Sequence, residues 1–208
     1  MDQVRPLRAR VVVVSSMPGK SSIKICCPGA DTVMLTEAAL KEKPCTALDM
    51  GTGSGYSAIE LARRGFKVHA CDICPHAVGS AKENALQESL SILFFMSDLW
   101  EHAGTYDMVI FNPPLSRANA SLKGIFRRFP LSERLGPLHY HVSGGFRREI
   151  VKRFISGAKK HLQPGGRLLI VTMTPELHCT WALAREHGFE LTIVASKGQY
   201  SIARLACN

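Results

Sequence analysis

The chain lacks long apolar runs and a disulfide framework. No run approaches the roughly 18 residues that cross a bilayer, and Val11–Val14 is too short even for the core of a signal peptide. The seven cysteines are odd in number and irregularly spaced, which is typical of proteins in a reducing compartment. These absences predict a cytoplasmic protein with no membrane segment.

Metal-ligand spacing is also missing. Cys71 and Cys74 form a CxxC pair, but no second pair follows at the spacing of a zinc ribbon, and the eight histidines show no ligand pattern. Small residues buried at a strand end account for the pair, so no metal site is predicted.

Acidic residues are few relative to basic ones. The chain has 17 Asp and Glu and 26 Lys and Arg, which gives a formal charge of +9. This charge favours an acidic partner such as nucleic acid or a ribonucleoprotein. The segment 112–144 has no clear period and is longer than an ordinary connection, as binding loops often are. Its basic residues, set against Glu133 alone, are Arg117, Lys123, Arg127, Arg128 and Arg134. A solvated basic surface is the alternative interpretation.

The length of 208 residues suits one domain. From Thr46 onward, short apolar runs alternate with amphipathic stretches, a pattern that predicts an α/β fold with a mostly parallel sheet of seven strands and helices on both faces. The expected strands are Thr46–Met50, Lys67–Asp72, Ile92–Met96, Met108–Phe111, Arg167–Thr172, Glu190–Ala195 and Tyr200–Ala206. The expected helices are Tyr56–Arg64, Pro75–Gln87, Phe146–His161 and Pro175–His187. Lys197-Gly198 predicts a hairpin that makes the C-terminal strand antiparallel.

Residues 1–44 are predicted to form an N-terminal annex to a cofactor-binding and catalytic core, residues 45–208. Within this annex, Asp31 is expected to cap a helix from Thr32 to about Lys43. Two short β-like segments, Val11–Ser15 and Ile23–Cys26, precede the helix.

A glycine-rich loop, Gly51-Thr52-Gly53-Ser54-Gly55, follows the first core strand. Its glycines allow a sharp turn and close approach to a ligand. No Lys-Ser/Thr pair follows them, and the spacing GxGxG differs from the dinucleotide pattern GxGxxG, so a phosphate ligand is disfavoured. Asp49 would repel pyrophosphate but suits a ligand with an ammonium and a sulfonium group. The loop therefore predicts S-adenosylmethionine.

Two further strand ends supply acidic residues. Asp72 closes the second core strand, where a carboxylate can accept hydrogen bonds from both ribose hydroxyls of an adenosine. Asp98-Leu99 follows the third strand, where adenine could donate its amine to the carboxylate and rest on the apolar side chain. The alternative for each acidic residue is a cap of the following helix. Trp100 could flank the adenine or belong to the core.

The corner Asn112-Pro113-Pro114 ends the fourth core strand. The prolines fix φ and remove N–H donors, so the carbonyl of Pro113 and the amide oxygen of Asn112 are paired acceptors. Such acceptors can hold both hydrogens of a planar amine, orient its lone pair and stabilise positive charge growing on nitrogen. A structural Pro-Pro turn is the alternative.

Together these motifs resemble the class I methyltransferases that methylate amino groups, which have a Rossmann-like fold. Pro28 and Asp31-Thr32, followed by Leu35, are similar to the P-x-x-D-T-x-x-L signature of archaeal and eukaryotic HemK-like methyltransferases, and Ser143-Gly144-Gly145 resembles their Gly-Gly segment. The resemblance implies that the cofactor is bound by Thr32, Asp49, Gly51, Gly53, Gly55, Asp72, Asp98, Leu99 and Asn112. It also implies that Asn112 and Pro113 are catalytic and that Asn112, Pro113, Pro114 and Leu115 hold the substrate.

The implied reaction is N5-methylation of the glutamine in the Gly-Gly-Gln tripeptide of a peptide-chain release factor. A small zinc-containing activator protein is the implied partner. The fourth corner residue is usually Tyr in that family and here is Leu115. A nucleobase would need another stacking face, from Phe111, Phe126 or Tyr140. Methylation of guanine N2 or adenine N6 in RNA or DNA is the alternative function, and a non-catalytic cofactor-binding subunit is a third.

Overall fold

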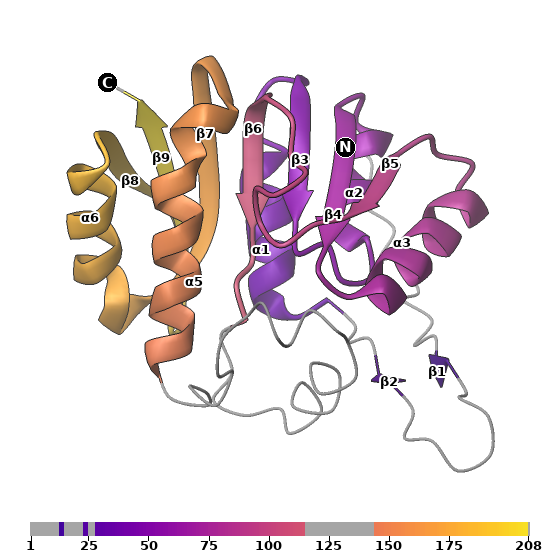
Figure 1. Cartoon of the computed structure of the whole chain (residues 1–208), viewed down its shortest axis with the longest axis horizontal. Coiled ribbons are helices and arrows are strands. Elements are labelled where there is room, and N and C mark those ends of the chain that lie inside the picture. The colour runs from indigo at the N-terminus through magenta and orange to yellow at the C-terminus, as the bar shows by residue number, and fades with distance from the viewer. Residues whose placement is uncertain (1–12, 15–22, 25–27, 115–143, 208) are drawn as a thin grey trace.

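The structure, a computed structural model, describes residues 13–14, 23–24, 28–114 and 144–207 (Figure 1). A two-residue ladder pairs β1 (Val13–Val14) with β2 (Ile23–Lys24). The remaining elements are α1 (Ala30–Ala39), β3 (Thr46–Met50), α2 (Tyr56–Arg63), β4 (Lys67–Asp72), α3 (Pro75–Gln87), β5 (Leu93–Met96), β6 (Tyr106–Phe111), α5 (Gly144–Gly157), the 3-10 turn η2 (Ala158–His161), β7 (Leu162–Met173), η3 (Thr174–Glu176), α6 (Leu177–Glu186), β8 (Phe189–Lys197) and β9 (Tyr200–Cys207).

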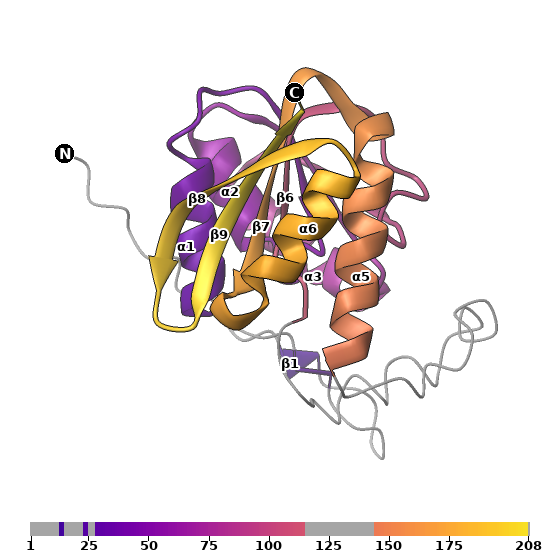
Figure 2. The same ribbon diagram turned by 90° about the vertical axis from the view of Figure 1, so that its left-hand side faces the viewer.

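The seven-stranded sheet has the order β5-β4-β3-β6-β7-β9-β8. Strands β5, β4, β3, β6 and β7 are parallel, whereas β9 is antiparallel to both β7 and β8. Figure 2 shows α1 and α2 on one side of the sheet and α5 and α6 on the other. The predicted fold is therefore confirmed. We call the edge where the five parallel strands end the carboxyl rim.

Both faces of the central strands are buried, as expected for a parallel sheet covered by helices. On β6, Met108 and Ile110 pack in a cluster with residues of α1 and α2, whereas Val109 and Phe111 pack with Phe154 of α5. Residues of α1 thus share the core of the sheet although they belong to the predicted annex. The division at residue 44 stays a prediction.

Several boundaries differ from those expected by one to a few residues, and three elements show the differences clearly. Strand β7 begins at Leu162 instead of Arg167, because the Pro164-Gly165-Gly166 sequence lies within the strand, where the register with β6 shifts between Tyr106 and Met108. Helix α6 begins at Leu177, after a 3-10 turn that contains Pro175. Helix α1 begins at Ala30 and ends at Ala39, with Gly29 at its N-cap.

None of the helices in residues 28–114 or 144–207 is long and apolar enough to cross a membrane.

Candidate active site

The residues singled out on the parallel strands lie on neighbouring parts of the carboxyl rim. Strands β5, β4, β3 and β6 are consecutive in the sheet. Asp72 is the last residue of β4, whereas Asp98, Gly51 and Asn112 follow the ends of β5, β3 and β6, respectively. Because the strands are parallel, these residues share one edge. The loop is tied to β4, since Thr52 N donates a hydrogen bond to the carbonyl of Cys71 at 2.9 Å.

The glycine loop leaves open space above the rim. Gly53 has a left-handed backbone, with φ of 55°, and no atom lies within 4 Å of the position that a β-carbon would take. Gly55 is the N-cap of α2 and also has positive φ, 82°. Its β-carbon position faces Ala81 of α3 at 2.9 Å. The loop is therefore packed against the fold at Gly55 and open at Gly53.

Asp49 lies beneath the loop and is buried. Its Oδ2 accepts hydrogen bonds from Thr52 Oγ1 at 2.6 Å and from Ala58 N at 3.2 Å. Burial raises the pKa of the Asp49 carboxyl to about 7, although both hydrogen bonds act in the opposite direction. Asp49 thus binds the loop and the first turn of α2 directly, an interaction that the sequence did not reveal.

Asp72 joins the loop to the start of α3. Its Oδ2 accepts from Gly53 N at 3.0 Å and its Oδ1 accepts from Cys74 N at 2.9 Å. Burial raises the pKa of this carboxyl, and the backbone hydrogen bonds oppose the shift. The bond to Cys74 forms a local turn, but no side chain caps α3, so Asp72 is not the helix cap of the alternative interpretation. Ribose binding by Asp72 stays a prediction.

Asp98 and Leu99 stand where β5 has ended. Asp98 Oδ2 accepts a hydrogen bond from Arg153 Nη2 of α5 at 2.9 Å. Leu99 is buried and has φ of 52°, an uncommon backbone for a residue other than glycine. Ser97 Oγ donates to the Leu99 carbonyl at 2.9 Å and holds this conformation. Strained residues of this kind are concentrated at functional sites.

Trp100 belongs to the core. Its ring stacks on Phe154 and His161, with centroids 5.1 and 4.9 Å away, and its Nε1 donates to the Phe154 carbonyl at 2.9 Å. Of the two interpretations of Trp100, the structure therefore supports packing against α5.

The Asn112 corner has one unusual acceptor. Asn112 Nδ2 donates to Asp31 Oδ2 at 3.0 Å and to Thr32 Oγ1 at 2.9 Å. Asn112 Oδ1 is buried and has no hydrogen-bond partner among the described residues. A buried carbonyl oxygen without a donor is costly, and such a group usually has a functional explanation. Pro113 is buried and Pro114 is exposed.

One prediction about α1 is wrong, and another stays a prediction. Asp31 was expected to cap the helix, but Gly29 is the N-cap and no side chain caps it. Asp31 lies in the first turn, where its carboxylate accepts from Asn112. Thr32 was predicted to bind the cofactor, and in the structure its hydroxyl contacts Asn112. Leu115 and the basic residues of the segment 112–144, together with Phe126 and Tyr140, lie outside the described residues.

The CxxC pair consists of two free cysteines. Burial raises the pKa of the Cys71 thiol to about 12, so this side chain stays protonated and unreactive at neutral pH. Cys74 is half-buried at the N-cap of α3. The pair thus consists of small residues at a strand end, as expected.

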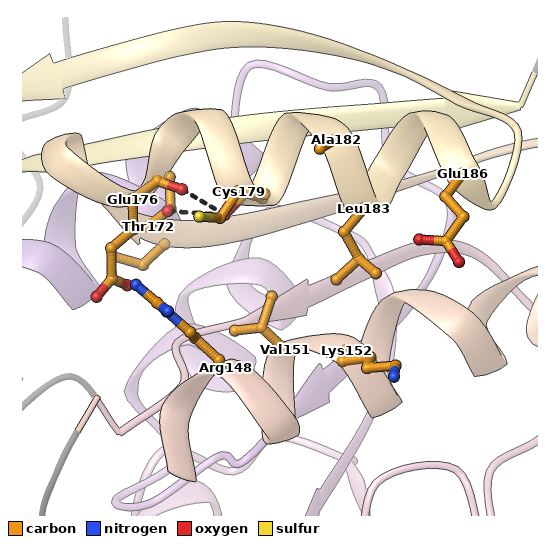
Figure 3. Close-up of a pocket in the computed structure, with 11 residues that line it drawn as sticks. Arg148, Val151, Lys152, Thr172, Glu176, Cys179, Ala182, Leu183 and Glu186 are labelled. Atoms are coloured by element: carbon orange, nitrogen blue, oxygen red, sulfur yellow. Dashed lines mark hydrogen bonds between the residues drawn. The ribbon is translucent and has the colours of Figure 1, made fainter. Parts of the chain in front are cut away.

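A cavity of about 290 Å³ lies between α5 and α6, beside the end of β7 (Figure 3). Val151, Val171 and Leu183 contribute apolar surface to it. Its charged residues are two basic side chains of α5 and two acidic ones of η3 and α6: Arg148, Lys152, Glu176 and Glu186. No sequence pattern indicates this cavity, because its lining combines positions from two helices, a 3-10 turn and a strand.

The chain is similar in sequence and in fold to known methyltransferases. The methyltransferase small domain family matches residues 27–132. A Methanocaldococcus jannaschii protein, provisionally named a protein N5-glutamine methyltransferase, is 33% identical over 148 residues, which are 69% of this chain and 70% of that protein. A release factor glutamine methyltransferase of Streptococcus pneumoniae is 31% identical over 189 residues, 88% of this chain.

The chain spans 66% of the length of the Streptococcus protein. It is also 31% identical, over 163 residues or 77% of this chain, to a ribosomal RNA small subunit methyltransferase C from Mannheimia succiniciproducens, of which it spans 41%. Among solved structures, a Thermus thermophilus 16S rRNA N2 methyltransferase in complex with AdoMet and guanosine has a TM-score of 0.60 at 18% identity, over 88% of this chain and 44% of that one. Family, relatives and fold agree: the chain belongs to the methyltransferase small domain family and is an S-adenosylmethionine-dependent methyltransferase.

Proposed function

We propose that the protein methylates N5 of the glutamine in the Gly-Gly-Gln tripeptide of a peptide-chain release factor. The observation that carries this proposal is the buried, unpartnered Oδ1 of Asn112. A planar NH2 group supplies the donor that this oxygen lacks. The Streptococcus pneumoniae relative carries the name of this activity.

The amide nitrogen of glutamine is a poor nucleophile because its lone pair is delocalised into the carbonyl. In the proposed mechanism, Asn112 Oδ1 and the Pro113 carbonyl each accept one of its hydrogens, which turns the lone pair toward the methyl group. The nitrogen would take the methyl group that the cofactor supplies and would then lose its surplus proton to water. Both acceptors stabilise the positive charge that grows on nitrogen.

S-adenosylmethionine supplies an electrophilic methyl group when bound. The rim fits this cofactor, because the space at Gly53 is open and acidic residues stand at Asp49, Asp72 and Asp98. We propose that Gly51, Gly53 and Gly55 shape the loop around the cofactor, that Asp72 accepts from the ribose, and that Asp98 and Leu99 hold the adenine. We also propose that Thr32 and Asn112, which are joined by a hydrogen bond, contribute to the cofactor site.

The choice of a protein substrate rests on two observations. Phe111 is buried, with its ring 4.7 Å from that of Phe154, so it offers no stacking face for a nucleobase. The cavity between α5 and α6 carries as many acidic as basic side chains and so does not favour phosphates. The net charge of +9 is the feature that favours the alternative, methylation of an RNA or DNA base.

An activator protein could dock at the edge of the sheet formed by β5, which pairs only with β4 in the described sheet. Leu86, Leu93 and Met96 expose apolar side chains there. An uncovered apolar edge strand is unfavourable in water and is typically covered by a partner. We propose this edge as the contact with the zinc-containing activator, and the cytoplasm as the place of the reaction.

Methyl transfer to release factor tests the proposed function. With labelled cofactor, we expect incorporation into intact release factor and loss of incorporation when its tripeptide Gln becomes Ala. Ribosomal RNA serves as the competing substrate, and mass spectrometry locates the methyl group. Transfer to a base instead of the glutamine, in a reaction that weakens steeply with salt, would establish the alternative.

Cofactor affinity should depend on the protonation of Asp49. Its pKa is raised to about 7 because burial disfavours the charge, so the carboxyl is neutral in acid and becomes charged as pH rises through 7. A positively charged cofactor favours the charged form. We therefore expect affinity to fall as pH decreases below 7, by up to about tenfold per unit.

Calorimetric titration between pH 5.5 and 7.5 measures this dependence and the proton released on binding. The variant Asp49→Asn keeps an acceptor for Thr52 and Ala58 but does not titrate, so its affinity should be flat over the same range. A wild-type affinity that does not change with pH would contradict the effect of the Asp49 charge. Protein stability should show the opposite trend, since the neutral form of Asp49 favours folding and this contribution is lost as pH rises through 7.

A further inference from the structure

The side-chain amide of Asn112 is held by two residues of α1. An asparagine NH2 group has two hydrogens. Here one is donated to Asp31 Oδ2 and the other to Thr32 Oγ1, at 3.0 and 2.9 Å. The donor capacity of Asn112 is therefore fully used by α1, and only its oxygen is left for another molecule.

We propose that Asp31 and Thr32 are positioning residues, which fix the Asn112 amide so that Oδ1 is always the atom presented to the NH2 group of the substrate. This inference rests on the proposed function. If the amide rotated by 180°, its oxygen would face the Asp31 carboxylate, which accepts hydrogen bonds and cannot donate them. The NH2 group of Asn112 would then face the hydrogens of the substrate, and neither could accept.

Asp31 also changes the charge on the acceptor. A hydrogen bond from an amide to a carboxylate is stronger than one between neutral groups and polarises the amide, which makes its oxygen more negative. The methyl transfer places positive charge on the substrate nitrogen next to that oxygen. The contribution of Asp31 therefore increases in the transition state, and its removal should lower kcat.

Helix α1 is anchored firmly enough for this role. Met34 and Leu35 are buried in the core, and Thr36 Oγ1 donates to the Thr32 carbonyl at 2.8 Å. The same hydroxyl lies 2.8 Å from Ser57 Oγ of α2 in a buried contact. Residues held by a packed helix keep catalytic geometry better than residues on loops.

Substitutions at Asp31 and Thr32 separate positioning from cofactor binding. We expect Asp31→Ala to lower kcat about 10- to 100-fold, the size of a lost hydrogen bond to a charged group, while the Kd of S-adenosylmethionine changes less than about twofold. Asp31→Asn keeps an acceptor without the charge and should have a smaller effect, and so should Thr32→Val. Glu37→Gln alters an exposed acid on the same helix and is the matched control, with unchanged kcat.

Exchanging the two side chains gives a stricter test. Asn112→Asp alone places two carboxylates opposite each other and should be nearly inactive. Combined with Asp31→Asn, the new amide at position 31 donates to the new carboxylate at position 112, whose second oxygen still accepts from the substrate. We expect the double variant to be at least about tenfold more active than Asn112→Asp alone, a rescue that a purely structural role of Asp31 would not give.

The NMR signals of the Asn112 side-chain amide test the positioning role without any substrate. We expect its Nδ2 hydrogens to exchange slowly with water in the wild type and rapidly in Asp31→Ala. Rapid exchange in the wild type, unchanged kcat in Asp31→Ala, or weakened cofactor binding at unchanged kcat would each overturn it. Failure of the proposed function has a different signature, since the wild type would then transfer no methyl group to release factor while the slow exchange persisted.

Discussion

Asn112→Ala should lower kcat about 100- to 1000-fold, the usual effect of removing an acceptor or donor that acts on charge developing in the transition state. The buried Oδ1 of Asn112 is the atom proposed to orient the substrate nitrogen. Without it, the NH2 group keeps at most one acceptor and its lone pair is no longer directed at the methyl group. Steady-state kinetics with release factor, at saturating cofactor, measures the loss.

The same substitution should leave the Kd of S-adenosylmethionine within about threefold, because the corner acts mainly on the substrate. It also removes the donor to Asp31 and Thr32, so unfolding free energy should fall by about 1–3 kcal/mol, which thermal denaturation records. Asn84→Ala is the matched comparison, since Asn84 Nδ2 donates to the Ser54 carbonyl of the glycine loop at 2.8 Å. That variant should weaken cofactor binding more than it lowers kcat. Full turnover by Asn112→Ala would refute the proposed role.

Local patterns were sufficient to predict most of the fold. β3, β4 and α3 have the expected bounds, and glycine, proline or a strand-end aspartate lies near every one of these boundaries except the end of α3. The predicted start of β7 was wrong because it relied on the same kind of signal. Pro164-Gly165-Gly166 is typical of a turn, but here the pairing with β6 includes it in the strand. Tertiary pairing, which sequence patterns do not contain, decided that boundary.

The location of the candidate site was also predictable, whereas its internal contacts were not. Parallel strands place their carboxyl ends at one edge, so Asp72, Gly51 and Asn112 could be grouped from the sequence. The bonds from Asn112 to Asp31 and from Arg153 to Asp98 join residues 81 and 55 positions apart. No local period relates such positions. The burial of Asp49 beneath its own loop likewise depends on packing.

Two glycine substitutions in the loop should affect different properties, one mainly protein stability and the other mainly cofactor affinity. Their comparison tests where the cofactor binds. In Gly55→Ala, the new methyl group stands 2.9 Å from the β-carbon of Ala81 and the backbone keeps φ near 82°. Overpacking and a left-handed alanine each cost about 1–2 kcal/mol. We expect unfolding free energy to fall by about 2–4 kcal/mol and Tm by roughly 5–15 °C. Thermal and denaturant unfolding of the free protein measure both.

Gly53→Ala should instead destabilise the fold less than Gly55→Ala does and should weaken cofactor binding. No atom lies within 4 Å of its β-carbon position, so only the left-handed backbone, with φ of 55°, is unfavourable, at about 1–2 kcal/mol. In the proposed complex the cofactor fills that open space, and the added methyl group should raise the Kd of S-adenosylmethionine at least about tenfold. Calorimetric titration of both variants with S-adenosylmethionine measures this change in Kd. Unchanged affinity in Gly53→Ala would mean that the cofactor does not contact this side of the loop. Where the cofactor packs directly against Gly53, no room is left for an added methyl group.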